Sequence, residues 1–163
     1  AQAPYELTLP LVIAGGIGTG RQLAAILAMG ADAILMGSRM LVAQELSIHP
    51  HYKELVAGGD GTESIIVKTG LRDHHRVLDN DSAKAVAALD AAGASDFEQY
   101  RPHVQGALAT HAYTSGDSSR GMLDYGPAVV FANAIEPVEA IFDTIIDDAR
   151  AALERLGQLT RLP

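Results

Sequence analysis

Two short apolar runs, each ending in glycine and separated by one helix, constrain the fold more than any other feature of this chain. The first run, Leu-Val-Ile-Ala at residues 11–14, is short enough for a strand that is buried on both faces. Thr19 and Gln22 then form the pattern of a capping box, which predicts a helix over residues 20–29 that stops at the glycine after it. The second run covers residues 33–36. This order predicts a parallel β-α-β unit whose two glycine turns open on the same side.

The two glycine turns, at residues 15–18 and 37–38, suit a bound anion. Glycine lets the backbone approach a ligand closely, and the N–H groups and dipole at a helix N-terminus attract phosphate. Eight-stranded (β/α) barrels often build a phosphate site of this kind after their last two strands. The alternative is that both are ordinary strand-to-helix turns of an α/β protein.

Two common nucleotide-binding motifs do not fit this segment. The dinucleotide fingerprint G-x-G-x-x-G, started at Gly16, requires its third glycine where Arg21 stands. The phosphate-loop motif fits Gly15 and Gly20, but Arg21 and Gln22 replace the lysine and the hydroxyl residue that should follow. Both motifs are therefore excluded.

The glycine-rich segment resembles the FMN-phosphate segment of one enzyme family. AGGIGTGRQLAAILAMGADAILMGSR, residues 14–39, is similar to that segment in nitronate monooxygenases and their relatives, which include FMN-dependent enoyl-ACP reductases and NADH:quinone reductases. The resemblance continues through Glu45, HPHYK at residues 49–53, RVLDN at residues 76–80, and residues 121–156. It implies an FMN-dependent oxidoreductase that oxidises alkyl nitronates, a small-molecule substrate, with molecular oxygen.

The resemblance also implies where the cofactor would lie. The backbone amides of Gly16, Gly37 and Ser38 would hold the FMN phosphate, helped by the Ser38 hydroxyl. The wall beneath it would be formed by Ala14, Gly15, Leu35 and Met36. The catalytic histidine of the family lies upstream of the matched segment, so no histidine of this chain inherits that role and the catalytic residue is unknown.

The resemblance further implies the C-terminal portion of a (β/α)₈ TIM barrel with an inserted, mainly helical subdomain. The expected parts are the last two barrel strands (1–41), a lid-like subdomain (42–133) and a helix that packs on the barrel (134–163). A complete barrel typically needs about 250 residues, whereas this chain has 163. The expected partners are therefore a missing N-terminal part of the barrel or a second copy in a homodimer, and the 163 residues alone are expected to bind FMN weakly.

The composition limits the remaining possibilities. The chain is 48% hydrophobic and 20% charged, so it can bury a core, and its net charge of −8 argues against nucleic-acid and anionic-membrane partners. It contains no cysteine, which excludes disulfides, thiolate zinc sites and cysteine nucleophiles. Neither an apolar run of membrane-spanning length nor a signal-peptide pattern is present in the sequence. A cytoplasmic protein is expected.

The middle of the chain is predicted to hold short elements. A helical pattern over residues 39–59 is interrupted at His49 and Pro50, and SIIVKT (64–69) predicts a strand before a charged turn at residues 72–76. Further predictions are a helix over 82–92 capped by Ser82, a helix over 96–112 that breaks or starts near Pro102, a loop at 116–119 and an apolar segment at 125–131.

The last predicted element is an amphipathic helix. Pro137 suits its first turn, Glu136 or Asn133 could cap it, and Gly157 is predicted to end it. Its apolar stripe consists of Val138, Ile141, Phe142, Ile145, Ala149, Ala152, Leu153 and Leu156.

Several polar side chains have two interpretations each. His49 and His51 could chelate a metal, but the simpler interpretation is a capped helix start at Pro50. Arg21 and Arg39 flank the glycine turns and could add charge to a phosphate, or could be solvated residues in the first turn of a helix. Arg76 could pair with Asp79 or another acidic group, as a structural salt bridge or to orient the lid.

Three rival functions stay open at this point. The same scaffold could serve an NAD(P)H:quinone or enoyl-ACP reductase. It could be a phosphate-binding barrel without flavin, such as an isomerase or synthase. It could also be a non-catalytic barrel fragment that acts as an assembly module, because open parallel strand edges require cover.

Overall fold

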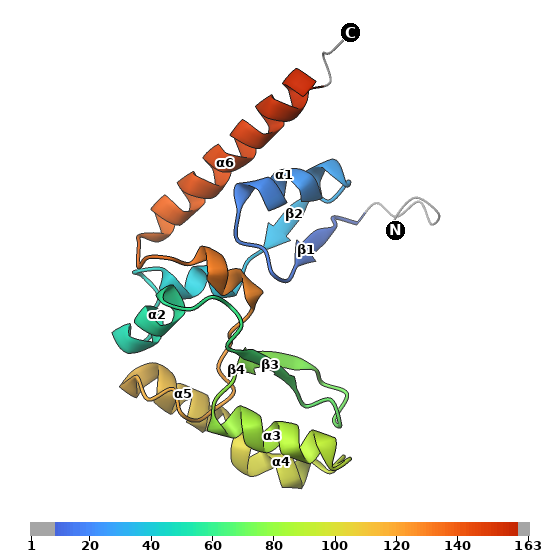
Figure 1. The fold of residues 1–163 in the computed structure, drawn as a ribbon, viewed down its shortest axis with the longest axis vertical. Coiled ribbons are helices and arrows are strands. Elements are labelled where there is room, and N and C mark those ends of the chain that lie inside the picture. The colour runs from blue at the N-terminus through green and yellow to red at the C-terminus, as the bar shows by residue number, and fades with distance from the viewer. Residues whose placement is uncertain (1–8, 160–163) are drawn as a thin grey trace.

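The computed structural model describes residues 9–159, which form an elongated α/β arrangement (Figure 1). The β-α-β unit and the C-terminal helix α6 lie at one end, and a β-hairpin lies with three helices toward the other. The described residues contain two separate two-stranded sheets and no closed barrel. The expected α/β class is therefore confirmed, whereas the division into three parts stays a prediction.

The β-α-β unit forms as its sequence predicts. β1 (Val12–Ala14) pairs in parallel with β2 (Ala33–Leu35), with Val12 opposite Ala33 and Ala14 opposite Leu35. Between them, α1 (Gly20–Ala28) begins at a complete capping box of Thr19 and Gln22. Both strands therefore end at the same edge, where the glycine turns follow.

The C-terminal helix α6 (Val138–Leu159) packs along α1. Asp148 of α6 accepts hydrogen bonds from the Arg21 backbone N–H at 3.0 Å and from the Arg21 Nε at 3.3 Å. The predicted end at Gly157 is wrong, because the helix continues through this residue to Leu159.

The predicted cap of α6 is also wrong. Neither Glu136 nor Asn133 satisfies the first turn; instead Glu45 Oε2 accepts the hydrogen bond of the Val138 N–H at 2.9 Å. The Glu136 carboxylate is bound by Arg39 Nη2 at 2.7 Å, and the backbone of Glu136 is paired with Val42 and Gln44. A distant segment therefore supplies the cap.

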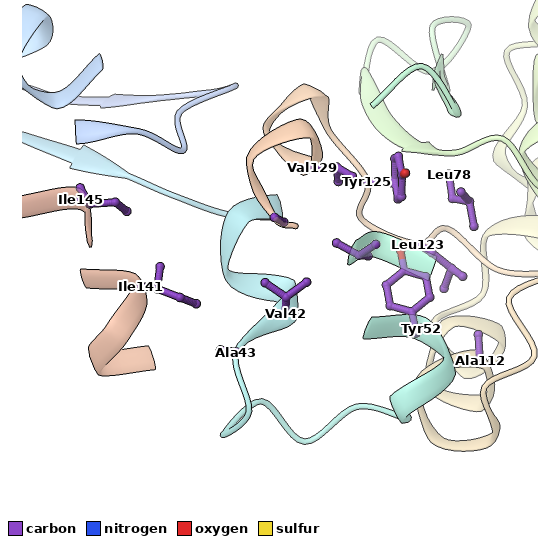
Figure 2. Close-up of a cluster of buried hydrophobic side chains, with 12 residues drawn as sticks. Val42, Ala43, Tyr52, Leu78, Ala112, Leu123, Tyr125, Val129, Ile141 and Ile145 are labelled. Atoms are coloured by element: carbon purple, nitrogen blue, oxygen red, sulfur yellow. The ribbon is translucent and has the colours of Figure 1, made fainter. Parts of the chain in front are cut away.

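The main hydrophobic core joins the two ends of the molecule. It lies among η2 (Ser38–Val42), α2 (Pro50–Ala57), η3 (Pro127–Phe131) and the first half of α6. Figure 2 shows Ile141 and Ile145 on one side of this core, the large side chains of Tyr52 and Tyr125 on the other, and Val42 between them. His49 caps α2 through its Nδ1, which accepts from the His51 N–H at 3.2 Å, so the predicted capped start at Pro50 is confirmed.

A second core lies beneath the β-hairpin. β3 (Ser64–Val67) pairs antiparallel with β4 (His75–Leu78), and Val67 and Val77 pack against α3 (Asp81–Ala91) and α4 (Phe97–Val104). The predicted strand stops at Val67 because Lys68 takes a positive φ of 63°. β4 begins inside the segment that the sequence predicts to be a charged turn.

Two helix starts differ from their predictions. Ser82 is not the cap of α3, because the helix begins at Asp81 and the preceding Asn80 accepts from the Ala83 N–H at 2.9 Å. Pro102 lies inside α4; the chain instead breaks at Gln105, whose extended backbone (φ −59°, ψ 130°) separates α4 from α5 (Gly106–Ser115).

An ion pair between Arg39 and Glu136 gives a first testable prediction. Arg39 Nη2 lies 2.7 Å from Glu136 Oε1, and only 6% of the Arg39 side chain is exposed. The Glu136 side chain is 27% exposed, so the pair is only partly buried. Removing Glu136 leaves the buried Arg39 charge uncompensated, so Glu136→Gln should lower the free energy of unfolding by about 2 kcal/mol. Urea denaturation measures this change.

The matched control is the exposed pair of Glu98 and Arg101 on α4. Glu98→Gln should lower the free energy of unfolding by less than about 0.5 kcal/mol, because water screens an exposed pair. Equal effects of the two substitutions would contradict the prediction.

Candidate functional site

The two glycine turns line one cavity of about 620 Å³. Every residue that the sequence assigns to the cofactor borders it, together with Ala14: Gly15, Gly16, Leu35, Met36, Gly37 and Ser38. The parallel pairing of β1 and β2 brings them together, because both strands end at the same edge. Their contact with FMN stays a prediction.

A side chain of α1 fixes the shape of the first glycine turn, residues 15–18. Gly15 and Gly16 take φ values of 100° and 69°, which favour glycine. The Gln22 side chain fixes the turn: its Nε2 donates to the Gly16 carbonyl at 2.9 Å, and its Oε1 accepts from the Gly18 N–H at 2.9 Å. The backbone around Gly16 is therefore preorganised.

The backbone of both turns offers unused hydrogen-bond donors. Among the residues that the structure describes, no acceptor lies within hydrogen-bond distance of the peptide N–H of Gly16, Gly37 or Ser38. A Cβ built on either glycine would also meet no atom within 4 Å. Free amides beside open space fit an anionic group such as a phosphate.

The Ser38 side chain ties the second turn to the opposite wall of the cavity. Ser38 Oγ accepts a hydrogen bond from the Gly126 N–H at 2.8 Å, and residues 126–128 also line the cavity. The hydroxyl proton of Ser38 is left available for a ligand. The sequence alone does not indicate this link, which joins residues 88 positions apart.

Contacts of Asp124 and Tyr125 place residues 124–128 against the hairpin. Tyr125 is 1% exposed and its hydroxyl lies 2.9 Å from Glu63 Oε2. Burial, followed by the neighbouring Glu63 carboxylate, raises the pKa of Tyr125, so the phenol stays protonated and can donate. Asp124 forms an isolated bridge with Val77 of β4, and its carboxylate lies 2.9 Å from His75 Nε2. The hydrogen bond from His75 lowers the pKa of Asp124.

Arg21 is exposed in the first turn of α1, which confirms one of its two interpretations, whereas Arg39 fits neither of its interpretations. Arg21 is directed to Asp148 on α6, and Arg39 is buried beside Glu136; neither lines the cavity. Arg76 does line it, and within the described part of the chain it forms no ion pair with Asp79 or any other carboxylate. The salt bridge predicted for Arg76 is therefore wrong, because alternate residues of β4 face opposite sides and Asp79 lies beyond the strand end.

The histidines and other candidate ligands lie elsewhere. All six histidines fall within residues 9–159, and none of them lines the cavity. In the same range, no three His, Asp or Glu side chains gather closely enough to hold a metal ion. None of the helices between residues 9 and 159 has the length and apolar character needed to cross a membrane.

Comparison with known proteins identifies a family and several relatives with similar sequences. The sequence profile of the nitronate monooxygenase family matches residues 1–148. A nitronate monooxygenase of Pseudomonas aeruginosa is 28% identical over 148 residues, which are 88% of this chain and 40% of that protein. The nitronate monooxygenase npaC of Metarhizium robertsii is 44% identical over 69 residues, which are 42% of this chain and 19% of that protein.

A solved structure shares the fold. FabK from Thermotoga maritima superposes with a TM-score of 0.82 at 27% sequence identity, over 94% of this chain and 48% of FabK. The chain thus spans less than half the length of each of these relatives. The match of the family profile over most of the sequence shows that this chain belongs to the nitronate monooxygenase family.

Proposed function

We propose that the chain carries the FMN-phosphate part of an oxidoreductase that oxidises alkyl nitronates with molecular oxygen. The observation that carries the proposal is the set of unpaired N–H groups of Gly16, Gly37 and Ser38 around one cavity. Membership of the nitronate monooxygenase family and relatives of that name support the reaction.

The residues of the site would have separate roles in binding FMN. The amides of Gly16, Gly37 and Ser38 would donate to the phosphate oxygens, and Gln22 would keep the first turn in its open shape. Ala14, Leu35 and Met36 provide apolar wall next to these donors. FMN supplies the redox chemistry when bound, whereas the protein supplies position and electrostatics.

The function is tested on the protein that contains this chain. The purified protein should carry flavin absorbance, and it should consume oxygen when an alkyl nitronate is added. The same preparation is assayed for NADH oxidation with a quinone, which is the reaction of the alternative function as an NAD(P)H:quinone reductase. A colourless protein that takes up no added FMN would contradict the cofactor, and flavin-dependent quinone reduction without nitronate-dependent oxygen uptake would contradict the reaction.

A further inference from the structure

Arg76 is the cationic side chain among the described residues that line the cavity. It comes from β4, where it pairs with Ile66 of β3, on the face of the hairpin that is turned away from Val77 and the second core. Both Arg76 and Ile66 are exposed, so this face is not covered by α3 or α4.

The guanidinium of Arg76 is positioned but not neutralised. Its Nη1 donates to Ser64 Oγ at 3.1 Å, and no carboxylate of the described residues lies within ion-pair distance. A guanidinium has five N–H donors, so most of them are left for another group. Arg21 and Arg39, by contrast, are already paired with Asp148 and Glu136.

Arg76 is connected to the second glycine turn, residues 37–38, through a short series of contacts. Its neighbour Val77 forms a bridge with Asp124, and two residues further Gly126 donates to Ser38 Oγ. The hairpin and residues 124–128 therefore form one connected wall, and Ser38 joins the second glycine turn to it. Arg76 and Ser38 line the same cavity.

The charge of the whole chain makes such a cation useful. A net charge of −8 creates an unfavourable field for a phosphate, which carries up to two negative charges near neutral pH. Backbone amides supply only partial charges. An unpaired arginine at the cavity supplies a full charge and two parallel donors that match phosphate geometry.

We propose that Arg76 is the side-chain counter-charge for the phosphate monoester that binds at the glycine turns. This inference rests on the proposed function, since it takes the phosphate to be that of FMN. Ser64 acts as a positioning residue, because it holds the guanidinium by one hydrogen bond without touching the phosphate.

The test compares FMN with riboflavin, which is the same flavin without the phosphate. Both are titrated by fluorescence quenching into the apoprotein that contains this chain, as wild type and as Arg76→Gln. FMN affinity should fall about tenfold or more, the effect of losing a charge-assisted hydrogen bond, while riboflavin affinity should not change. The salt dependence of FMN binding should also become weaker in the variant.

Three further variants separate charge from structure. Arg76→Lys keeps the charge but loses the two-donor geometry, so its FMN affinity should lie between those of wild type and Arg76→Gln. Ser64→Ala should weaken FMN binding less than Arg76→Gln does. Arg120→Gln removes one exposed positive charge that does not line the cavity, and its FMN affinity should equal that of wild type.

The outcomes distinguish this inference from the proposed function. If wild type binds FMN far better than riboflavin and Arg76→Gln keeps that preference, the role of Arg76 is wrong and the cofactor assignment stands. Equal losses for FMN and riboflavin in Arg76→Gln would also overturn the inference, since they would place Arg76 at the ring or in the fold. A wild type that binds neither flavin would contradict the proposed function itself.

Discussion

Replacing Gly37 with valine should release FMN from the protein while its helices stay folded. Gly37 has a negative φ of −107°, and an added Cβ would meet no protein atom within 4 Å, so the surrounding protein leaves space for a side chain here. The same side chain would stand beside the free amides of Gly37 and Ser38, where the phosphate is proposed to bind. Losing these charge-assisted hydrogen bonds should weaken FMN binding roughly hundredfold, as measured by fluorescence titration.

Two companion variants identify the cause. Ser38→Ala removes one hydroxyl and should weaken FMN binding by only about tenfold, because the amides stay in place. Gly106→Val adds the same side chain at another position with open space, outside the cavity, and should leave FMN affinity unchanged. Circular dichroism checks that helical content is preserved. Unchanged FMN affinity in Gly37→Val would refute the assignment of this turn to the phosphate.

The glycine turns could be predicted from the sequence because their signals are local. Thr19 and Gln22 are three residues apart and form the capping box that the structure contains. The glycines that end β1 and β2 lie next to the apolar runs that form the strands. The residues of one wall of the cavity could therefore be predicted from local sequence spacing, without any tertiary information.

The other wall could not be predicted in this way. Arg76 reaches the cavity only because β4 pairs with β3 and bridges Asp124, and its strand is short and begins with two polar residues. Its sequence lacks the alternation of apolar and polar residues that would predict a strand. Ser38 and Gly126 likewise meet across 88 positions.

Tertiary packing also explains why the two arginines nearest to the glycine turns in sequence do not line the cavity. Arg21 and Arg39 lie within three residues of the glycine turns, and this proximity in sequence is the reason that they could serve a phosphate. In the structure α6 supplies Asp148 to the first, and the segment before α6 supplies Glu136 to the second. Carboxylates more than 90 positions away thus decide where these side chains point.

Gly20 occupies the second glycine position of the phosphate-loop motif, which this sequence does not complete. In the structure, this glycine has a role in helix packing instead. It is the first residue of α1 and is buried where α1 crosses α6. A Cβ at this position would lie 2.0 Å from the Ile145 carbonyl oxygen and 2.3 Å from the Ala149 nitrogen. Both atoms belong to the α6 backbone, which cannot move aside as a flexible side chain would. The glycine therefore permits close approach of the two helices.

Gly20→Ala should consequently lower the free energy of unfolding by about 3 kcal/mol or more, at the upper end of the cost of overpacking, because α1 and α6 must separate. Urea denaturation of the protein that contains this chain measures the effect. Gly157→Ala is the matched control, since it adds a Cβ to a helical glycine of α6 with no atom within 4 Å. That variant should gain about 0.5–1 kcal/mol from helix propensity alone. If Gly20→Ala were as stable as wild type, the close contact of α1 with α6 would not contribute to the stability of the β-α-β unit.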